Sequence, residues 1–303
     1  MLPHEAALPG PTPDSKCLWR AERGLRHTPL VMKNLLIDLP EKLRVRNVGR
    51  CNLRETAAAH THGWDESKAR TESKRLSGKL GELQYRLHAD ARYGVLVVLQ
   101  AIDGGGKDST IRHVFSAFNP QGCTVHAFKA PSAEELSHDY LWRVHAHTPP
   151  RGEIALFNRS HYEDVLVARV DRLVPQSIWQ ARYRQINDFE RMLVENRIHV
   201  VKLFLHISKA EQRRRFEERI HEPRKQWKFD PQDLVKRKQW QAYRVAFGDM
   251  LGRCNTQYAP WYVVPGNHKW FRDLAVSQIM YATLRSLALR FPPPRFNPRV
   301  RFT

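Results

Sequence analysis

The chain has 303 residues, of which 42% are hydrophobic and 27% are charged. That length and composition are enough to bury a large core, so an unfolded tail is excluded. Fifty Lys and Arg against thirty-one Asp and Glu give a formal net charge of +19. This charge favours polyanionic partners such as nucleic acid, polyphosphate or acidic lipid, without choosing among them.

The sequence carries no sign of a membrane segment or of a disulfide framework. No stretch reaches the ~20 consecutive apolar residues of a membrane span, which predicts a cytoplasmic protein with no membrane partner. The four cysteines stand far apart with no paired spacing, which indicates a reducing compartment.

The two ends of the chain differ from its middle. Residues 1–31 contain several prolines and no apolar periodicity, which predicts a disordered extension. Met32 is therefore a candidate for the natural start. Residues 32–294 are expected to form a single domain, and residues 295–303, which follow a proline run, an extended tail.

Helical and strand patterns alternate along the middle of the chain. Residues 65–92 lack proline and carry leucines three to four apart, which predicts an amphipathic helix. Residues 95–99 form a short apolar run rich in β-branched side chains, which predicts a central parallel strand. Four more strands are predicted at 124–128, 154–157, 200–207 and 261–264. Further helices are predicted at 107–118, 133–145, 162–169, 176–196 and 271–290. This alternation implies an α/β fold with a parallel sheet covered on both faces.

The most informative segment is residues 101–110, between the predicted central strand and a predicted helix. It resembles a phosphate-binding loop, in which backbone N–H groups and the positive end of the helix surround phosphate oxygens. Lys107 is placed to neutralise the transferred group. The predicted phosphate-binding residues are Gly104, Gly105, Gly106, Lys107, Asp108, Ser109 and Thr110. The alternative is a glycine-rich turn with a solvated lysine.

Two positions of this loop depart from the usual pattern. Ala101 stands where the first glycine is expected, and Asp108 stands where a Ser or Thr normally binds magnesium. Asp103, inside the loop, is a hard oxygen donor of the kind that Mg²⁺ takes together with phosphate oxygens and water. Asp103 is therefore the predicted metal ligand.

Polar residues also follow the predicted strand 154–157. In parallel sheets ligands bind beyond the carboxyl ends of the strands. Asn158 and Arg159 are therefore expected to touch phosphate or metal, with Glu163 and Asp164 one turn into the next helix as further candidate metal ligands. The alternative for the two acids is a helix cap that faces solvent.

Residues 209–238 hold eleven Lys or Arg against six acids, which suggests a basic flap. Arg215 and Arg219 are four apart and share one helix face. Pro223 ends that helix, so Lys225 and Lys228 follow on a turn. The alternative is a charged helix that only faces solvent.

Several blocks of the sequence, taken in order, resemble the family-2 polyphosphate kinases. The blocks lie at 99–108, 119–122, 131–143, 157–164, 211–229 and 259–265. The resemblance spans about 35–294 and implies a three-layer, thymidylate-kinase-like P-loop kinase fold with a helical lid at about 209–240. Asn158 together with Glu163 resembles the class III members, which are associated with phosphorylating both AMP and ADP.

The resemblance also implies roles for the site residues. Asp103 would help to hold Mg²⁺, Lys107 would grip the phosphoryl group, and Arg159 would stabilise the developing charge. Residues implied for the lid and polyphosphate are Arg215, Arg219, Lys225 and Lys228. Residues implied for the nucleotide or polyphosphate path are Lys129, Arg143, Asn158 and Glu163, the last of which would bias mono- against diphosphate acceptors.

Together these features predict a reversible, Mg²⁺-dependent kinase that transfers the terminal phosphoryl group of inorganic polyphosphate to ADP or AMP, which would regenerate ATP. Mn²⁺ is expected to substitute for Mg²⁺, no nucleic-acid partner is expected, and a homo-oligomer is implied by analogy. Two alternatives stay open. One is an ATP-dependent nucleoside or polynucleotide kinase, and the other is a non-enzymatic, basic P-loop module that binds nucleic acid.

Overall fold

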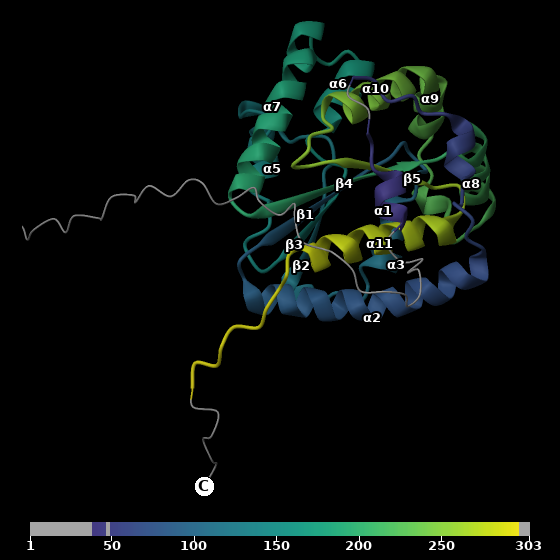
Figure 1. Cartoon of the computed structure of the whole chain (residues 1–303). Helices are drawn as coiled ribbons and strands as arrows, with labels where there is room; N and C mark the ends of the chain where they lie inside the picture. The colour runs from purple at the N-terminus through teal and green to yellow at the C-terminus, as the bar shows by residue number, and fades with distance from the viewer. Residues whose placement is uncertain (1–37, 47–48, 297–303) are drawn as a thin grey trace, which may run out of the picture. The chain divides into compact units, whose positions relative to one another are not determined.

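The computed structural model describes residues 38–46 and 49–296. Its centre is a five-stranded sheet in the order β2-β3-β1-β4-β5, and every pairing is parallel (Figure 1). The strands are β1 (Gly94–Gln100), β2 (Cys123–Ala127), β3 (Ile154–Asn158), β4 (Ile198–His206) and β5 (Trp261–Pro265). All five predicted strands are confirmed, and the predicted central strand is the middle one.

Helices cover both faces of this sheet, as the alternating pattern predicted (Figure 1). The helices of one core cluster are α1 (Asp38–Leu43), α2 (Glu66–Asp90), α3 (Lys107–Val114) and α11 (Lys269–Ser286). Those of the other are α6 (Glu163–Val170), α7 (Gln176–Glu195) and α10 (Trp240–Arg253). All seven residues of β1 are buried, because it has a neighbour on each side and helices above and below.

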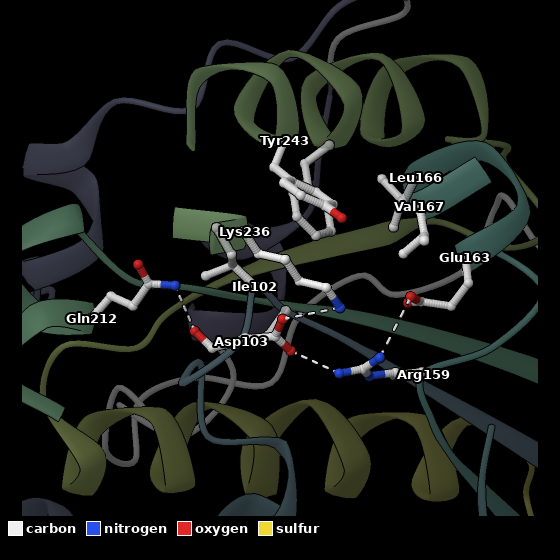
Figure 2. Close-up of a pocket in the computed structure, with 11 residues that line it drawn as sticks. Ile102, Asp103, Arg159, Glu163, Leu166, Val167, Gln212, Lys236 and Tyr243 are labelled. Atoms are coloured by element: carbon white, nitrogen blue, oxygen red, sulfur yellow. Dashed lines mark hydrogen bonds and ion pairs between the residues drawn. The ribbon is translucent and has the colours of Figure 1, made fainter. Parts of the chain in front are cut away.

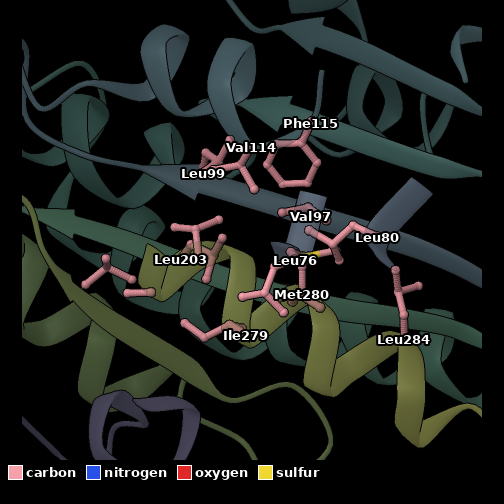
Figure 3. Close-up of a cluster of buried hydrophobic side chains, with 14 of the residues drawn as sticks. Leu76, Leu80, Val97, Leu99, Val114, Phe115, Leu203, Ile279, Met280 and Leu284 are labelled. Atoms are coloured by element: carbon pink, nitrogen blue, oxygen red, sulfur yellow. The ribbon is translucent and has the colours of Figure 1, made fainter. Parts of the chain in front are cut away.

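The core between α2, α11 and the sheet is built from the leucine pattern of the predicted first helix. Leu76 and Leu80 are fully buried and lie against Val97 of β1 and Met280 of α11 (Figure 3). Burying each of these side chains contributes ~1.5–3 kcal/mol. The leucines predicted to recur every three to four residues therefore form the face of α2 that packs against α11 and the sheet.

The helix predicted over 133–145 is wrong, because the structure divides it into α4 (Ala133–Ser137) and α5 (Trp142–His145). Ser132 and Glu135 form a capping box that starts α4. His138 is extended, and the Asp139 carboxylate accepts a hydrogen bond from the backbone N–H of Leu141. This local turn competes with the helix and ends it. Two other predicted helices are shorter than expected, since α3 ends at Val114 and α11 at Ser286.

α10, which covers one face of the sheet, is not among the predicted helices. Gly248 and Gly252 lie one turn apart where residues 49–51 cross the helix, and a Cβ at Gly252 would lie 1.7 Å from the Gly49 carbonyl oxygen. Glycine allows this close crossing, although it lowers helix propensity.

The basic segment forms α8 (Lys209–His221), the short 3-10 helix η4 (Gln226–Lys228) and α9 (Gln232–Lys238). α8 ends just before Pro223, as predicted. Two other 3-10 helices are η2 (Glu55–Ala59) and η3 (Pro120–Gly122).

The predicted extension at 1–31 lies outside the described residues, as does the predicted tail beyond residue 296. The division into one domain with a disordered N-terminal extension and an extended C-terminal tail therefore stays a prediction. None of the helices in the described part of the chain is both long and apolar enough to cross a membrane.

Candidate functional site

The glycine loop turns sharply between β1 and α3. Gly104 has φ = 80° and Gly106 has φ = 101°, a region that residues with a Cβ rarely adopt. The N–H of Gly105 donates to the Ile102 carbonyl at 2.8 Å, and Gly106 is the N-cap of α3. The loop therefore presents its backbone at the N-terminus of a helix, at the carboxyl edge of the sheet.

A carboxylate and a guanidinium from neighbouring strands meet beside this loop. Arg159, which follows β3, donates from Nη2 to Oδ1 of Asp103 at 2.7 Å. Its Nη1 lies 4.0 Å from Oε2 of Glu163, and Nζ of Lys236 lies 3.9 Å from Oδ2 of Asp103. Figure 2 shows these four side chains converging on one pocket. Lys107 donates from Nζ to the Ala101 carbonyl at 3.1 Å within the same loop.

The charges of this group are strongly coupled. Burial alone would raise the pKa of Asp103, but the charges of Lys107 and Arg159 hold it below its usual range. Burial lowers the pKa of Lys107, and the charge of Arg159 lowers it further. Burial also raises the pKa of Glu163. The site thus holds an ionised Asp103 between cations, a setting typical of functional sites.

A buried hydrogen-bond network follows Arg159 in the chain. Arg159 has φ = 65°, which costs energy for a residue with a Cβ. The next residues are anchored, because Ser160 Oγ accepts from Gln100 at 3.1 Å and from the Tyr162 N–H at 3.2 Å. The Tyr162 hydroxyl donates to Glu190 at 2.6 Å.

Lys202 of β4 closes this network. Its Nζ donates to Glu190 Oε2 and to the Cys254 carbonyl, each at 2.6 Å, and to the Tyr162 hydroxyl at 3.0 Å. The side chains of Lys202 and Glu190 are both fully buried. Because each charge is satisfied, the pair holds the start of α6 in one place.

Other predicted residues lie near the loop or away from the pocket. Asn158 donates to the Asp108 carboxylate at 2.6 Å, so the end of β3 and the start of α3 are joined. Asp164 accepts from Arg182 at 2.9 Å and does not line the pocket, and burial raises its pKa to about 6. The structure therefore favours Glu163 over Asp164 as a second carboxylate of the site.

The predicted path residues Lys129 and Arg143 are tied to one another. Arg143 donates to the Lys129 carbonyl at 2.8 Å and to Glu135 at 3.0 Å, and its guanidinium lies over the Phe128 ring. Neither side chain lines the pocket of Asp103. Their place on a substrate path stays a prediction.

The predicted lid residues are engaged with other protein groups. Arg215 is 6% exposed and donates to Glu211 and to the carbonyls of Gly104 and Gly266. It therefore ties α8 to the glycine loop. Arg219 pairs with Asp233 at 3.3 Å.

Further along the lid, Lys225 pairs with Glu218 and Glu222, and Lys228 lies over the Trp227 ring. Binding of polyphosphate by all four cations of this lid stays a prediction.

Four further residues belong to this site and did not stand out in the sequence. Gln212 donates to the Asp103 carbonyl at 2.8 Å, and Lys236 and Tyr243 line the pocket. Arg272 of α11 is fully buried, and its Nη1, which has no hydrogen-bond partner among the described atoms, lies 2.3 Å from where a Cβ of Gly106 would stand. Lys236 lies in the basic segment, so its place in the site could have been predicted from the sequence. Arg272 is brought to the loop only by the tertiary fold.

The central strand of the parallel sheet leads into a glycine loop that carries a lysine and a carboxylate. This arrangement is that of a P-loop kinase fold. The family model described as "Polyphosphate kinase 2 (PPK2)" matches residues 63–291. The chain belongs to this family, so the resemblance found in the sequence and the predicted fold class are both confirmed.

Individual relatives agree with this assignment. A Meiothermus ruber protein named AMP/ADP-polyphosphate phosphotransferase is 48% identical over 256 residues, which cover 84% of this chain and 96% of that protein. An ADP-polyphosphate phosphotransferase of Rhodopseudomonas palustris is 46% identical over 74% of this chain and 80% of its own length. The crystal structure of polyphosphate kinase 2 from Arthrobacter aurescens TC1 matches with a TM-score of 0.81 and 36% identity over 86% of this chain and 93% of that one.

Proposed function

We propose that this enzyme transfers the terminal phosphoryl group of inorganic polyphosphate to ADP and to AMP, and also catalyses the reverse reaction. The observation that carries the proposal is the convergence of Asp103, Arg159 and Lys107 on a phosphate loop in a chain of this family. The name of the Meiothermus ruber relative supports the use of both acceptors. Family membership favours this reaction over an ATP-dependent kinase and over a nucleic-acid-binding module.

The geometry suits phosphoryl transfer because this reaction needs alignment and charge neutralisation rather than a nucleophile on the protein. The loop N–H groups and Lys107 would hold the terminal phosphate of the donor. Arg159 would stabilise the charge that develops on the transferred group. Gln212 and Tyr243, which close the pocket from α8 and α10, would exclude water that hydrolyses the donor.

A divalent cation fits this donor set. Asp103 is ionised, Glu163 lines the same pocket, and Mg²⁺ takes one or two carboxylates together with phosphate oxygens and water. We propose that Asp103 holds Mg²⁺, or Mn²⁺ in its place, and that the ion neutralises phosphate charge when bound. No group of three His, Cys, Asp or Glu side chains in the described ranges is arranged to hold a metal, so phosphate oxygens would complete the ligand set.

The test is a matrix of donors and acceptors with the purified full chain. We expect ATP from ADP and ADP from AMP when polyphosphate is the only phosphoryl donor and Mg²⁺ is present. Chelation of the metal should abolish both products. Transfer from ATP to nucleosides or polynucleotides, with none from polyphosphate, would contradict the proposal. Sedimentation of the same sample would test the homo-oligomer that we also propose by analogy.

A further inference from the structure

A second, larger groove lies on the outer side of the edge strand β5 and is separate from the pocket of Asp103. One wall is the segment 42–46, and the other is the segment 51–60 with η2. Val263 and Pro265 of β5 form part of the floor, and His206 closes the end at the carboxyl edge of the sheet.

The wall at 42–46 presents cations in a row. The N–H of Val45 donates to the Trp261 carbonyl at 2.8 Å, and Arg44 pairs with Tyr262 as an antiparallel bridge. This extended backbone points alternate side chains to opposite sides. Val45 is accordingly buried, while Arg44 is half-buried and Arg46 is exposed; Lys42 precedes them in the last turn of α1.

The lining of the groove is strongly positive. It contains Lys42, Arg44, Arg46 and Arg54 and no Asp or Glu. Arg46 pairs with Glu41 at 2.9 Å in an exposed contact, which is weak in water. Arg44 and Arg54 form neither an ion pair nor a side-chain hydrogen bond with any residue that the structure describes. Arg44 and Arg54 are therefore the residues that indicate an anion site, since no ion pair in the described ranges compensates their charges.

This groove opens at the same edge of the sheet as the active site. β5 and β1 are separated only by β4, so their carboxyl ends lie about 10 Å apart, or two strand spacings. The start of α10 lies between the two sites, because Lys236, four residues before Trp240, lines the pocket, while Trp240 Nε1 donates to Oε1 of Glu55, which follows Arg54, at 3.2 Å. A polymer whose end lies at the glycine loop could continue into the groove.

We propose that the groove binds the distal part of a long polyphosphate donor, while its terminal phosphate lies at the glycine loop. The proposal rests on the proposed function and adds a second contact site for the same substrate. Inorganic polyphosphate is a linear chain with charge on every unit, which suits a row of cations. Nucleic acid is the competing ligand: no Phe, Tyr or Trp lines the groove, but His60, His62 and His206 do and can stack on bases, so the test includes an oligonucleotide.

The test compares the full-length wild type with the double variant Arg44→Glu/Arg54→Glu. The matched control is Arg184→Glu/Arg191→Glu, which makes the same charge change on the exposed surface of α7. Titration calorimetry would measure the dissociation constants for long-chain polyphosphate, for tripolyphosphate and for a single-stranded oligonucleotide. Thermal unfolding would show whether each variant is folded, and the milder Arg44→Gln/Arg54→Gln repeats the test if the first variant is not.

We expect the groove variant to bind long-chain polyphosphate about tenfold or more weakly, with a smaller salt dependence, and to bind tripolyphosphate as the wild type does. The control variant should change neither affinity. Equal losses for long and short donors, or an equal loss in the control, would overturn the proposal. Tighter binding of the oligonucleotide than of polyphosphate, with the same loss in the groove variant, would assign the groove to nucleic acid instead. Failure of the proposed function would be seen separately, as a wild type that makes no ATP from ADP and polyphosphate.

Discussion

The glycine loop and the lid are both rich in charge, but they hold it in different ways. Around the loop, Asp103 meets Arg159 from the next strand, and the network behind them joins Lys202 to Glu190 in full burial. Within α8 of the lid, the ion pairs join residues three or four apart on the same helix, as in the exposed pair Arg213–Glu217. Charges fixed by distant, buried partners are sensitive to substitution, whereas local exposed pairs are not.

The largest effect on stability is expected for Lys202→Met. This change leaves Glu190 buried without its cation, which should lower the free energy of unfolding by about 3–5 kcal/mol in urea titration. The double variant Lys202→Met/Glu190→Leu removes both charges and should recover much of the loss. A single variant as stable as the wild type would show that the network contributes nothing to the fold behind Arg159.

Lys107→Ala should have the largest effect on turnover. Because it removes a charge at the transferred group, kcat should fall about 10²-fold or more, while the unfolding midpoint stays close to that of the wild type. Asp103→Ala should lower kcat similarly through the loss of its carboxylate, and should also lower the unfolding midpoint because Arg159 loses its partner. Initial rates with polyphosphate and ADP measure both effects, and near-native rates would remove these residues from the mechanism.

The charged residues around the glycine loop could be predicted from the sequence, because they directly follow the strands that position them. The run at 95–99 and the glycines after it placed Lys107 and Asp103 at the end of the central strand, and the polar group after 154–157 placed Arg159 beside them.

Residues brought in by long-range packing could not be predicted in that way. Arg272 reaches the loop from α11 and Tyr243 from α10, whose glycines obscured the helix. The separation of Asp164 from the pocket also depends on a partner, Arg182, in another helix.

Gly106→Ala should show how closely the loop is packed from behind. Alanine is strained at φ = 101°, and its Cβ would displace the buried Arg272 guanidinium. We expect a loss of about 1–3 kcal/mol in stability together with weaker binding of the donor. The double variant Gly106→Ala/Arg272→Ala removes the clash but not the strain, so it should recover only part of the loss. Full recovery would show that the backbone conformation costs little, and no loss in the single variant would contradict the geometry of the loop.

The smallest effect is expected in the lid, for Arg213→Ala. Its guanidinium pairs with Glu217 on the same exposed helix face, where water and salt screen the interaction. Neither the unfolding midpoint nor kcat should change measurably. Arg215, two residues further on, is the matched contrast, because it is buried against the carbonyls of Gly104 and Gly266. Arg215→Ala should therefore lower both stability and kcat, since it leaves the loop carbonyls unpaired and releases α8 from the loop. Equal effects of the two substitutions would mean that the lid acts through its total charge. The burial of Arg215 would then make no difference to its role.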